Sequence, residues 1–500
     1  MDISILALLL ILPFIGAIVT LVMGGERQKY AKFVAAAFAA ATLVISLYIM
    51  FFADYESLGM DVTWITTDLI TINFALQVDG LSILMVFLTA LLSLLVVIFS
   101  ASEKDRPNYF HTLVLAMEVG LMGVYMAWDY FLFYVMWELT LIPMYFMISW
   151  YGGPRRHYAA IKFFIYTHVA SLVMLIGIFA MGFEAMSITG EGMNLSFDVI
   201  NTVMPLADET FQILVFALLF FGFMVKMPAV PFHTWLPDAH TEAPTGGSVL
   251  LAGVMLKIGS YGIIRVCIEA LPAGADYWQW VIIGIALLSM IYGAYGCIAQ
   301  SDLKKMVAFS SISHMGMVML GIGCGTEAGI MFAVFQMFAH GLITGVLFMV
   351  AGMAGHNFGT REIPLLGGIA GRVPIYATFM MIGFMASLGL PGLVGFWGEF
   401  PLVFAFYEFI QSEGMLWLIL FCLLNLMLTA GYYLWAMQRV LFGPETKKIE
   451  LDHIHDVSKT EGIAMGVLVG LIALFGVWPD LALSYIGDYT SQLLSMGLII

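Results

Sequence analysis

Residues 211–237 read FQILVFALLFFGFMVKMPAVPFHTWLP, a long apolar run that contains one lysine and is interrupted by Pro228 and Pro231. About 20 consecutive apolar residues are enough for a helix to cross the hydrocarbon core of a bilayer. Proline removes an internal hydrogen bond of a helix, so the two prolines predict a break inside the membrane. The stretch therefore predicts a membrane protein with a discontinuous helix that places Lys226 at its break.

The composition of the whole chain agrees with this prediction. Of the 500 residues, 62% are hydrophobic and 11% are charged, whereas an ordinary soluble domain carries roughly 25% charged residues. This composition excludes a soluble enzyme, a disordered chain and a nucleic-acid-binding protein. We expect fourteen apolar spans, at about 3–23, 33–52, 78–100, 111–128, 130–150, 163–183, 210–230, 245–265, 279–299, 306–324, 328–354, 374–400, 415–438 and 462–480.

The basic residues predict how these spans are oriented. Sixteen of the 19 lysines and arginines fall in loops that follow odd-numbered spans, among them Lys447 and Lys448, and the loops after even-numbered spans have none. Basic loops favour the cytoplasmic side of a membrane, so we expect both termini on the outer side. The first run follows the acidic Asp2 and is expected to be a retained span. Because no transit peptide is visible, a bacterial inner membrane is favoured over an organelle membrane.

A second interruption predicts an internal repeat. Residues 377–403 form another apolar run, which is broken by Leu390-Pro391-Gly392 and by Gly395. Two broken helices at corresponding positions are typical of inverted repeats in transporters. We therefore predict an all-α polytopic membrane protein with about 14 transmembrane helices, in which spans 4–8 and 9–13 form two inverted five-helix repeats with broken helices 7 and 12. The expected parts are residues 1–110, 111–265, 279–441 and 442–500.

Several ionisable residues lie inside the predicted spans. Each buried charge costs about 2.5–3.5 kcal/mol on insertion scales, so such residues indicate a function. A Lys–Glu pair that can open would act as a proton switch, and histidine can relay protons. We expect Arg265, near the outer end of span 8, to extend to the membrane surface. The candidate site residues are Glu118, Glu138, Lys226, Lys257, His314, His340 and Glu399.

Structural interpretations of these residues stay open at this point. Glu138 and Lys226 could form a static ion pair, and His314 or His340 could be a hydrogen-bonded core histidine. Glu118 could pack against serine and threonine side chains of neighbouring spans.

No metal or cofactor is expected in this chain. Asp238, His240 and Glu242 fit no metal-ligand spacing, so helix capping and loop anchoring are the better interpretation. The four cysteines lie 27 or more residues apart, which matches no iron–sulfur, zinc or haem motif.

Four segments resemble motifs of the antiporter-like membrane subunits of respiratory complex I: residues 136–146, 225–245, 302–314 and 390–400. They occur in the order of that family, and the resemblance covers roughly residues 75–445. The paralogous subunits L and N carry lysine where this chain has Glu399. The glutamate therefore resembles a third paralogue of the family.

The resemblance implies a proton-translocating subunit of a complex that transfers electrons from NADH to quinone. FMN, iron–sulfur clusters and quinone are then expected in partner subunits, and the partners include other membrane-arm subunits, among them L and N. The resemblance implies that Glu138 and Lys226 form an input pair and that Glu399 is the terminal group. It implies a central relay of Lys257, His314 and His340, while Glu118 carries over less directly.

Three other classes of function remain as alternatives. A subunit of a multi-subunit cation/proton antiporter would share Glu138 and Lys226, and Glu399 argues against it. A redox subunit that holds haem or quinone would need paired histidines on facing helices. A purely structural subunit would tolerate replacement of Lys226.

Overall fold

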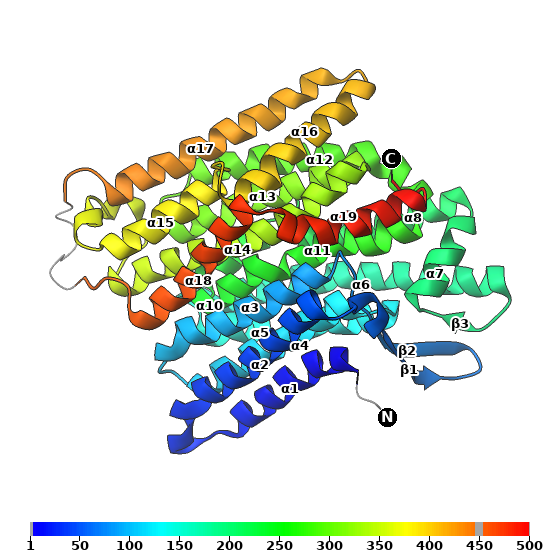
Figure 1. The fold of residues 1–500 in the computed structure, drawn as a ribbon, viewed down its shortest axis with the longest axis horizontal. Helices are drawn as coiled ribbons and strands as arrows, with labels where there is room; N and C mark the ends of the chain where they lie inside the picture. Colours follow the sequence, from blue (N-terminus) through cyan, green and yellow to red (C-terminus); the bar gives the residue numbers. More distant parts are fainter. Residues whose placement is uncertain (1–3, 446–453, 500) are drawn as a thin grey trace.

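The computed structural model describes residues 4–445 and 454–499, so Lys447 and Lys448 lie outside the described residues. Within the described part of the chain, thirteen helices are long and apolar enough to cross a membrane. They run side by side in one bundle, and the start of α1 and the end of α19 lie at the same end of it (Figure 1). The predicted polytopic helical fold is confirmed.

The first half of the chain contributes helices α1 (Ile5–Val22), α2 (Ala31–Phe52), α3 (Ile83–Phe99), α4 (Pro107–Met126), α5 (Tyr130–Tyr151), α6 (Arg156–Thr189), α7 (Phe197–Val203), α8 (Glu209–Lys226), α9 (Trp235–Glu242), α10 (Thr245–Leu250) and α11 (Lys257–Gly262). The second half contributes α12 (Pro272–Ile298), α13 (Leu303–Cys324), α14 (Glu327–Asn357), α15 (Pro374–Ser387), α16 (Val394–Ser412), α17 (Ile419–Leu441), α18 (Lys459–Val477) and α19 (Asp480–Ser495).

The two predicted interruptions coincide with helix ends. Helix α8 ends at Lys226 and α9 begins at Trp235. Predicted span 12 is divided between α15 and α16, and neither of them is among the thirteen helices that are both long and apolar enough to span. In the turn between them Gly389 and Gly392 have φ angles of 78° and 91°, a conformation that glycine adopts without steric cost.

A small β-sheet was not predicted. Strand β1 (Met60–Thr66) pairs antiparallel with β2 (Ile70–Leu76), and β2 pairs parallel with the short β3 (Met193–Asn194). The sheet lies at the end of the bundle that holds the termini (Figure 1). It lies between apolar spans, where the span pattern gives no information about local pairing.

Helix α19 was also not predicted as an element. Its buried residues Ala482, Ile486, Tyr489 and Leu493 are three or four positions apart, so they form one apolar face. That face packs against α14.

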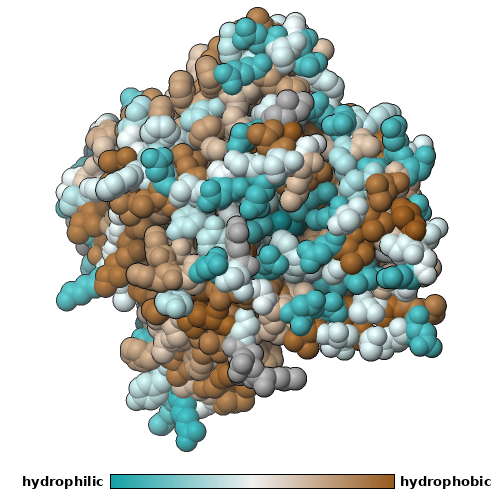
Figure 2. All heavy atoms as spheres, turned by 45° about the vertical axis from the view of Figure 1, so that its right-hand side comes forward, coloured by the Kyte–Doolittle hydropathy of each residue, from teal (hydrophilic) through white to brown (hydrophobic). Residues whose placement is uncertain are grey.

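Figure 2, in which this end of the molecule comes forward, shows hydrophilic side chains gathered in the middle of the view with apolar side chains around them.

Candidate functional site

Lys257 lies in a continuous helical run, Thr245–Ile268, that is completely buried in the bundle. The run changes from α-helix to π-helix twice, at Leu251–Met255 and at Ile263–Ile268, so π-turns flank the lysine on both sides. Such turns are rare in proteins, and those that occur often lie at functional sites. The Lys257 ammonium donates to the carbonyl of Ala252 and lies 2.8 Å from Nδ1 of His340.

His340 begins a connected series of side-chain contacts that leads to Glu399, in which the two histidines touch through their rings and Nε2 of His340 has no hydrogen-bond partner among the described residues. The rings of His340 and His314 have their centroids 5.4 Å apart. On the far side of His314, Nδ1 lies 2.9 Å from a carboxylate oxygen of Glu399. The four predicted residues Lys257, His340, His314 and Glu399 thus meet in the core, and they come from α11, α14, α13 and α16.

Two further polar residues hold His314. Its Nε2 lies 3.1 Å from Oγ of Ser387, which donates to Oη of Tyr433 at 2.7 Å. Ser387 is the last residue of α15, so the helix break orients the histidine. No sequence pattern indicates this role, because Ser387 and Tyr433 look like ordinary members of apolar spans.

Glu138 and Lys226, the predicted input pair, are not in direct contact. Glu138 accepts from Ser171 and lies 2.9 Å from Nδ1 of His168. The Lys226 ammonium lies over the ring of Trp137, 5.4 Å from its centroid. Within the described residues the ammonium has no hydrogen-bond partner, so a static Glu138–Lys226 ion pair is absent from this conformation.

Two side chains hydrogen-bond to backbone groups at the break after Lys226. The indole N–H of Trp235 donates to the carbonyl of Val225 at 2.9 Å. The N–H of Val230 donates to Oγ of Ser289 at 3.0 Å. These bonds stabilise the interruption inside the membrane, where an unsatisfied backbone group costs several kcal/mol.

Glu118 is separate from this network. It is fully buried in α4, and in the described part of the chain neither carboxylate oxygen has a hydrogen-bond partner. In this conformation no serine or threonine of the described residues therefore hydrogen-bonds to Glu118, and packing against such side chains stays an interpretation. Its role stays a prediction.

The side chains of Asp238, His240 and Glu242 have three separate partners. Asp238 pairs with Lys162 at 2.7 Å, and Glu242 accepts from the N–H of Arg155. The ring of His240 stacks on Phe348, with centroids 4.4 Å apart. These contacts anchor the loops on both sides of α9.

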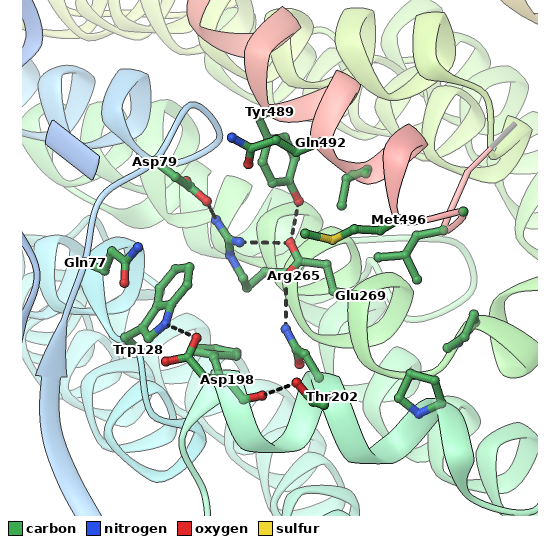
Figure 3. Close-up of a pocket in the computed structure, with 17 residues that line it drawn as sticks. Gln77, Asp79, Trp128, Asp198, Thr202, Arg265, Glu269, Tyr489, Gln492 and Met496 are labelled. Atoms are coloured by element: carbon green, nitrogen blue, oxygen red, sulfur yellow. Dashed lines mark hydrogen bonds and ion pairs between the residues drawn. The ribbon is translucent and has the colours of Figure 1, made fainter. Parts of the chain in front are cut away.

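The prediction for Arg265 is wrong, because this side chain is buried. It donates to carboxylate oxygens of Asp79 and Glu269. Tyr489 of α19 donates to Glu269 at 2.5 Å. Figure 3 shows these side chains pointing toward one another beside a cavity of about 720 Å³. The guanidinium is thus held inside the protein by charge-assisted hydrogen bonds to two carboxylates.

Fold and site together define a class: a polytopic membrane protein that carries a series of ionisable side chains through its core. The family model described as "NADH:quinone oxidoreductase/Mrp antiporter, TM" matches residues 127–429. The model described as "NADH-Ubiquinone oxidoreductase (complex I), chain 5 N-terminus" matches residues 64–102. The chain belongs to the NADH:quinone oxidoreductase/Mrp antiporter family of membrane proteins.

Relatives match almost the whole chain. F(420)H(2) dehydrogenase subunit M of Methanosarcina mazei is 38% identical, over 98% of this chain and 98% of its own length. NADH-quinone oxidoreductase subunit M of Rhodobacter capsulatus is 36% identical, over 98% of this chain and 96% of its own length.

Solved structures show the same fold. A chain of respiratory complex I from Thermus thermophilus has a TM-score of 0.86 and 28% identity, with 98% of this chain and 99% of that chain covered. A chain of the Mrp complex from Dietzia sp. has a TM-score of 0.84, with 99% of this chain and 98% of that chain covered. Its sequence identity is 20%, so this likeness is evidence for the fold and not for the function.

Proposed function

We propose that this chain is the subunit M of a proton-translocating NADH-quinone oxidoreductase, in which electrons are transferred on partner subunits. The relatives that bear the name NADH-quinone oxidoreductase subunit M support this proposal. The connected series Lys257–His340–His314–Glu399 is the observation that carries it. Buried ionisable residues of this kind mark proton pathways in membrane proteins.

Glu138 and Lys226 regulate proton loading in this proposal. A proton is taken up from the inner side near the break after α8 and loads Lys226 or Lys257. A nearby carboxylate favours a charged ammonium and its withdrawal favours release. A movement of Glu138, driven by a neighbouring subunit, therefore changes how strongly Lys226 holds its proton.

The proton then passes from Lys257 along a chain of the histidines His340 and His314 and water, and leaves to the outer side through Glu399. Moving one charge against 100 mV costs about 2.3 kcal/mol. A hundredfold change in proton affinity corresponds to about 2.7 kcal/mol. The free-energy change from opening one ion pair is thus large enough to drive the step. Glu118 is a further candidate whose connection to this series is untested.

The setting of the chain forms part of the same proposal. We place it in a bacterial inner membrane with both termini outside, beside other membrane-arm subunits that include the paralogues L and N. The parts 111–265 and 279–441 act as the two inverted repeats, and each contains one of the breaks. FMN, iron–sulfur clusters and quinone belong to the partners, so the electron donor is set there.

The test replaces Lys226 by alanine in native membranes. After assembly of the complex is confirmed, NADH-to-quinone electron transfer and proton uptake into vesicles are measured together. We expect both rates to fall about tenfold or more, whereas Lys29→Ala, in the exposed segment between α1 and α2, leaves them unchanged. Normal rates in Lys226→Ala would overturn the proposal. Sodium-dependent transport by a chain that purifies without redox partners would support the antiporter alternative instead.

A further inference from the structure

Helix α6 holds the Glu138 carboxylate from one side. Nδ1 of His168 lies 2.9 Å from one carboxylate oxygen, and Oγ of Ser171 donates to the other. The His168 ring is itself fixed by stacking on Phe164, with centroids 5.3 Å apart and planes 19° apart. Both oxygens of Glu138 are thus occupied by residues one turn apart on a single helix.

The ammonium of Lys226 lies over two aromatic rings. It is 5.4 Å from the ring centroid of Trp137, the residue before Glu138, and 5.7 Å from that of Phe163. Its nitrogen has no hydrogen-bond partner in the part of the chain that the structure describes. A desolvated ammonium over two ring faces is stabilised much less than one paired with a carboxylate.

We propose that His168 is a positioning residue that competes with Lys226 for the Glu138 carboxylate. This inference rests on the proposed function, in which that carboxylate controls proton loading. The structure then represents the open state of the input pair, with Glu138 held by α6. A hydrogen bond to a charged group contributes enough to change the ratio of open to closed states roughly tenfold to a hundredfold.

The two partners of this contact are both partly exposed. The side chain of His168 is 36% exposed in the isolated chain and that of Glu138 is 23% exposed. Lys162, a cation of the same helix α6, is already paired with Asp238. His168 and Ser171 are thus the residues of α6 that hold the Glu138 carboxylate.

The test compares His168→Leu, which removes the hydrogen bond, with His168→Gln, which keeps an N–H donor. Proton uptake coupled to electron transfer is measured after assembly of the complex is confirmed. His168→Leu lets Glu138 close onto Lys226, so we expect turnover to fall about tenfold. His168→Gln is expected to recover most of this loss, because its N–H donor can still hold the carboxylate.

His157→Gln on the same helix is the matched control, since His157 contacts Ser149 rather than Glu138. Wild-type turnover in His168→Leu overturns the inference, and so does a His168→Gln variant as slow as His168→Leu. If His168→Leu does not assemble, an assembled His168→Gln variant whose turnover is about tenfold below that of the wild type overturns it alone. Lys226→Ala separates the two levels of the proposal. If Lys226→Ala is inactive while the His168 variants match the wild type, only the role of His168 is wrong. If Lys226→Ala is fully active, the proposed function itself is wrong.

Discussion

The ammonium nitrogen of Lys257 lies 2.8 Å from Nδ1 of His340, and this contact joins the two halves of the membrane bundle. Lys257 belongs to the first predicted repeat and His340 to the second. The π-turns on both sides of Lys257 change the rotation of its helix, and His340 lies in the middle of α14. A proton held in the first half therefore has a partner in the second half within hydrogen-bond distance.

Replacement of Lys257 by methionine tests this junction. Methionine has a similar length and no charge, so the packing of the buried site is largely kept. We expect proton uptake to fall about tenfold or more, because His340 loses its proton donor. Lys305→Met, near the start of α13, serves as the control. Vesicle acidification at wild-type rates in Lys257→Met would show that protons bypass this residue.

Glu399→Gln tests the other end of the series. Glutamine keeps the shape of the side chain but cannot release a proton, so His314 loses its anionic partner at 2.9 Å. We expect fewer protons moved per electron pair and a turnover about tenfold lower. Glu408→Gln changes an exposed acid on the same helix. This control variant should move as many protons per electron pair as the wild type. An unchanged ratio in Glu399→Gln would contradict a terminal role.

The parts of the fold that were predicted follow from local chemistry. Apolar runs show where the chain can lie in a bilayer, and prolines or glycines within a run show where a helix must end. Lys226 and Glu399 were found because a charge inside such a run is costly whatever surrounds it. These signals need no knowledge of which helices are neighbours.

The parts that were missed depend on tertiary contacts. Arg265 finds Asp79, which lies 186 positions away in the sequence, so no local pattern could show that it is buried. His168 lies in an apolar run, and its contact with Glu138 forms only when α6 packs against α5. The π-turns around Lys257 likewise have no signature in the sequence, because packing rather than propensity selects them.

The Arg265 cluster leads to a prediction about stability. Arg265→Met leaves Asp79 and Glu269 as two buried carboxylates without a counter-charge. Breaking a buried ion pair by removing one partner costs about 3–5 kcal/mol. We expect a clearly lower midpoint of thermal unfolding in detergent, whereas the exposed Arg27→Met has no effect. The triple variant Asp79→Asn, Arg265→Met, Glu269→Gln should recover much of the loss, because no charge remains unpaired. If Arg265→Met alone is as stable as the wild type, a structural role for the cluster is excluded.

Asp129 leads to a prediction about pH. Its buried carboxylate lies between α4 and α5 and accepts from the N–H groups of Phe131 and Leu132, which caps α5. Burial raises the pKa of Asp129 to about 6, and nearby Asp61 adds to the rise, although these backbone hydrogen bonds oppose it. The folded state therefore binds the proton more strongly than the unfolded chain. The resulting stabilisation is complete below about pH 4 and is lost as the pH rises through about 6.

Asp129→Asn keeps a capping side chain but cannot titrate. Its unfolding midpoint in detergent should therefore change less across this window than that of the wild type. Parallel pH curves for the two proteins would show that Asp129 keeps its ordinary pKa when folded.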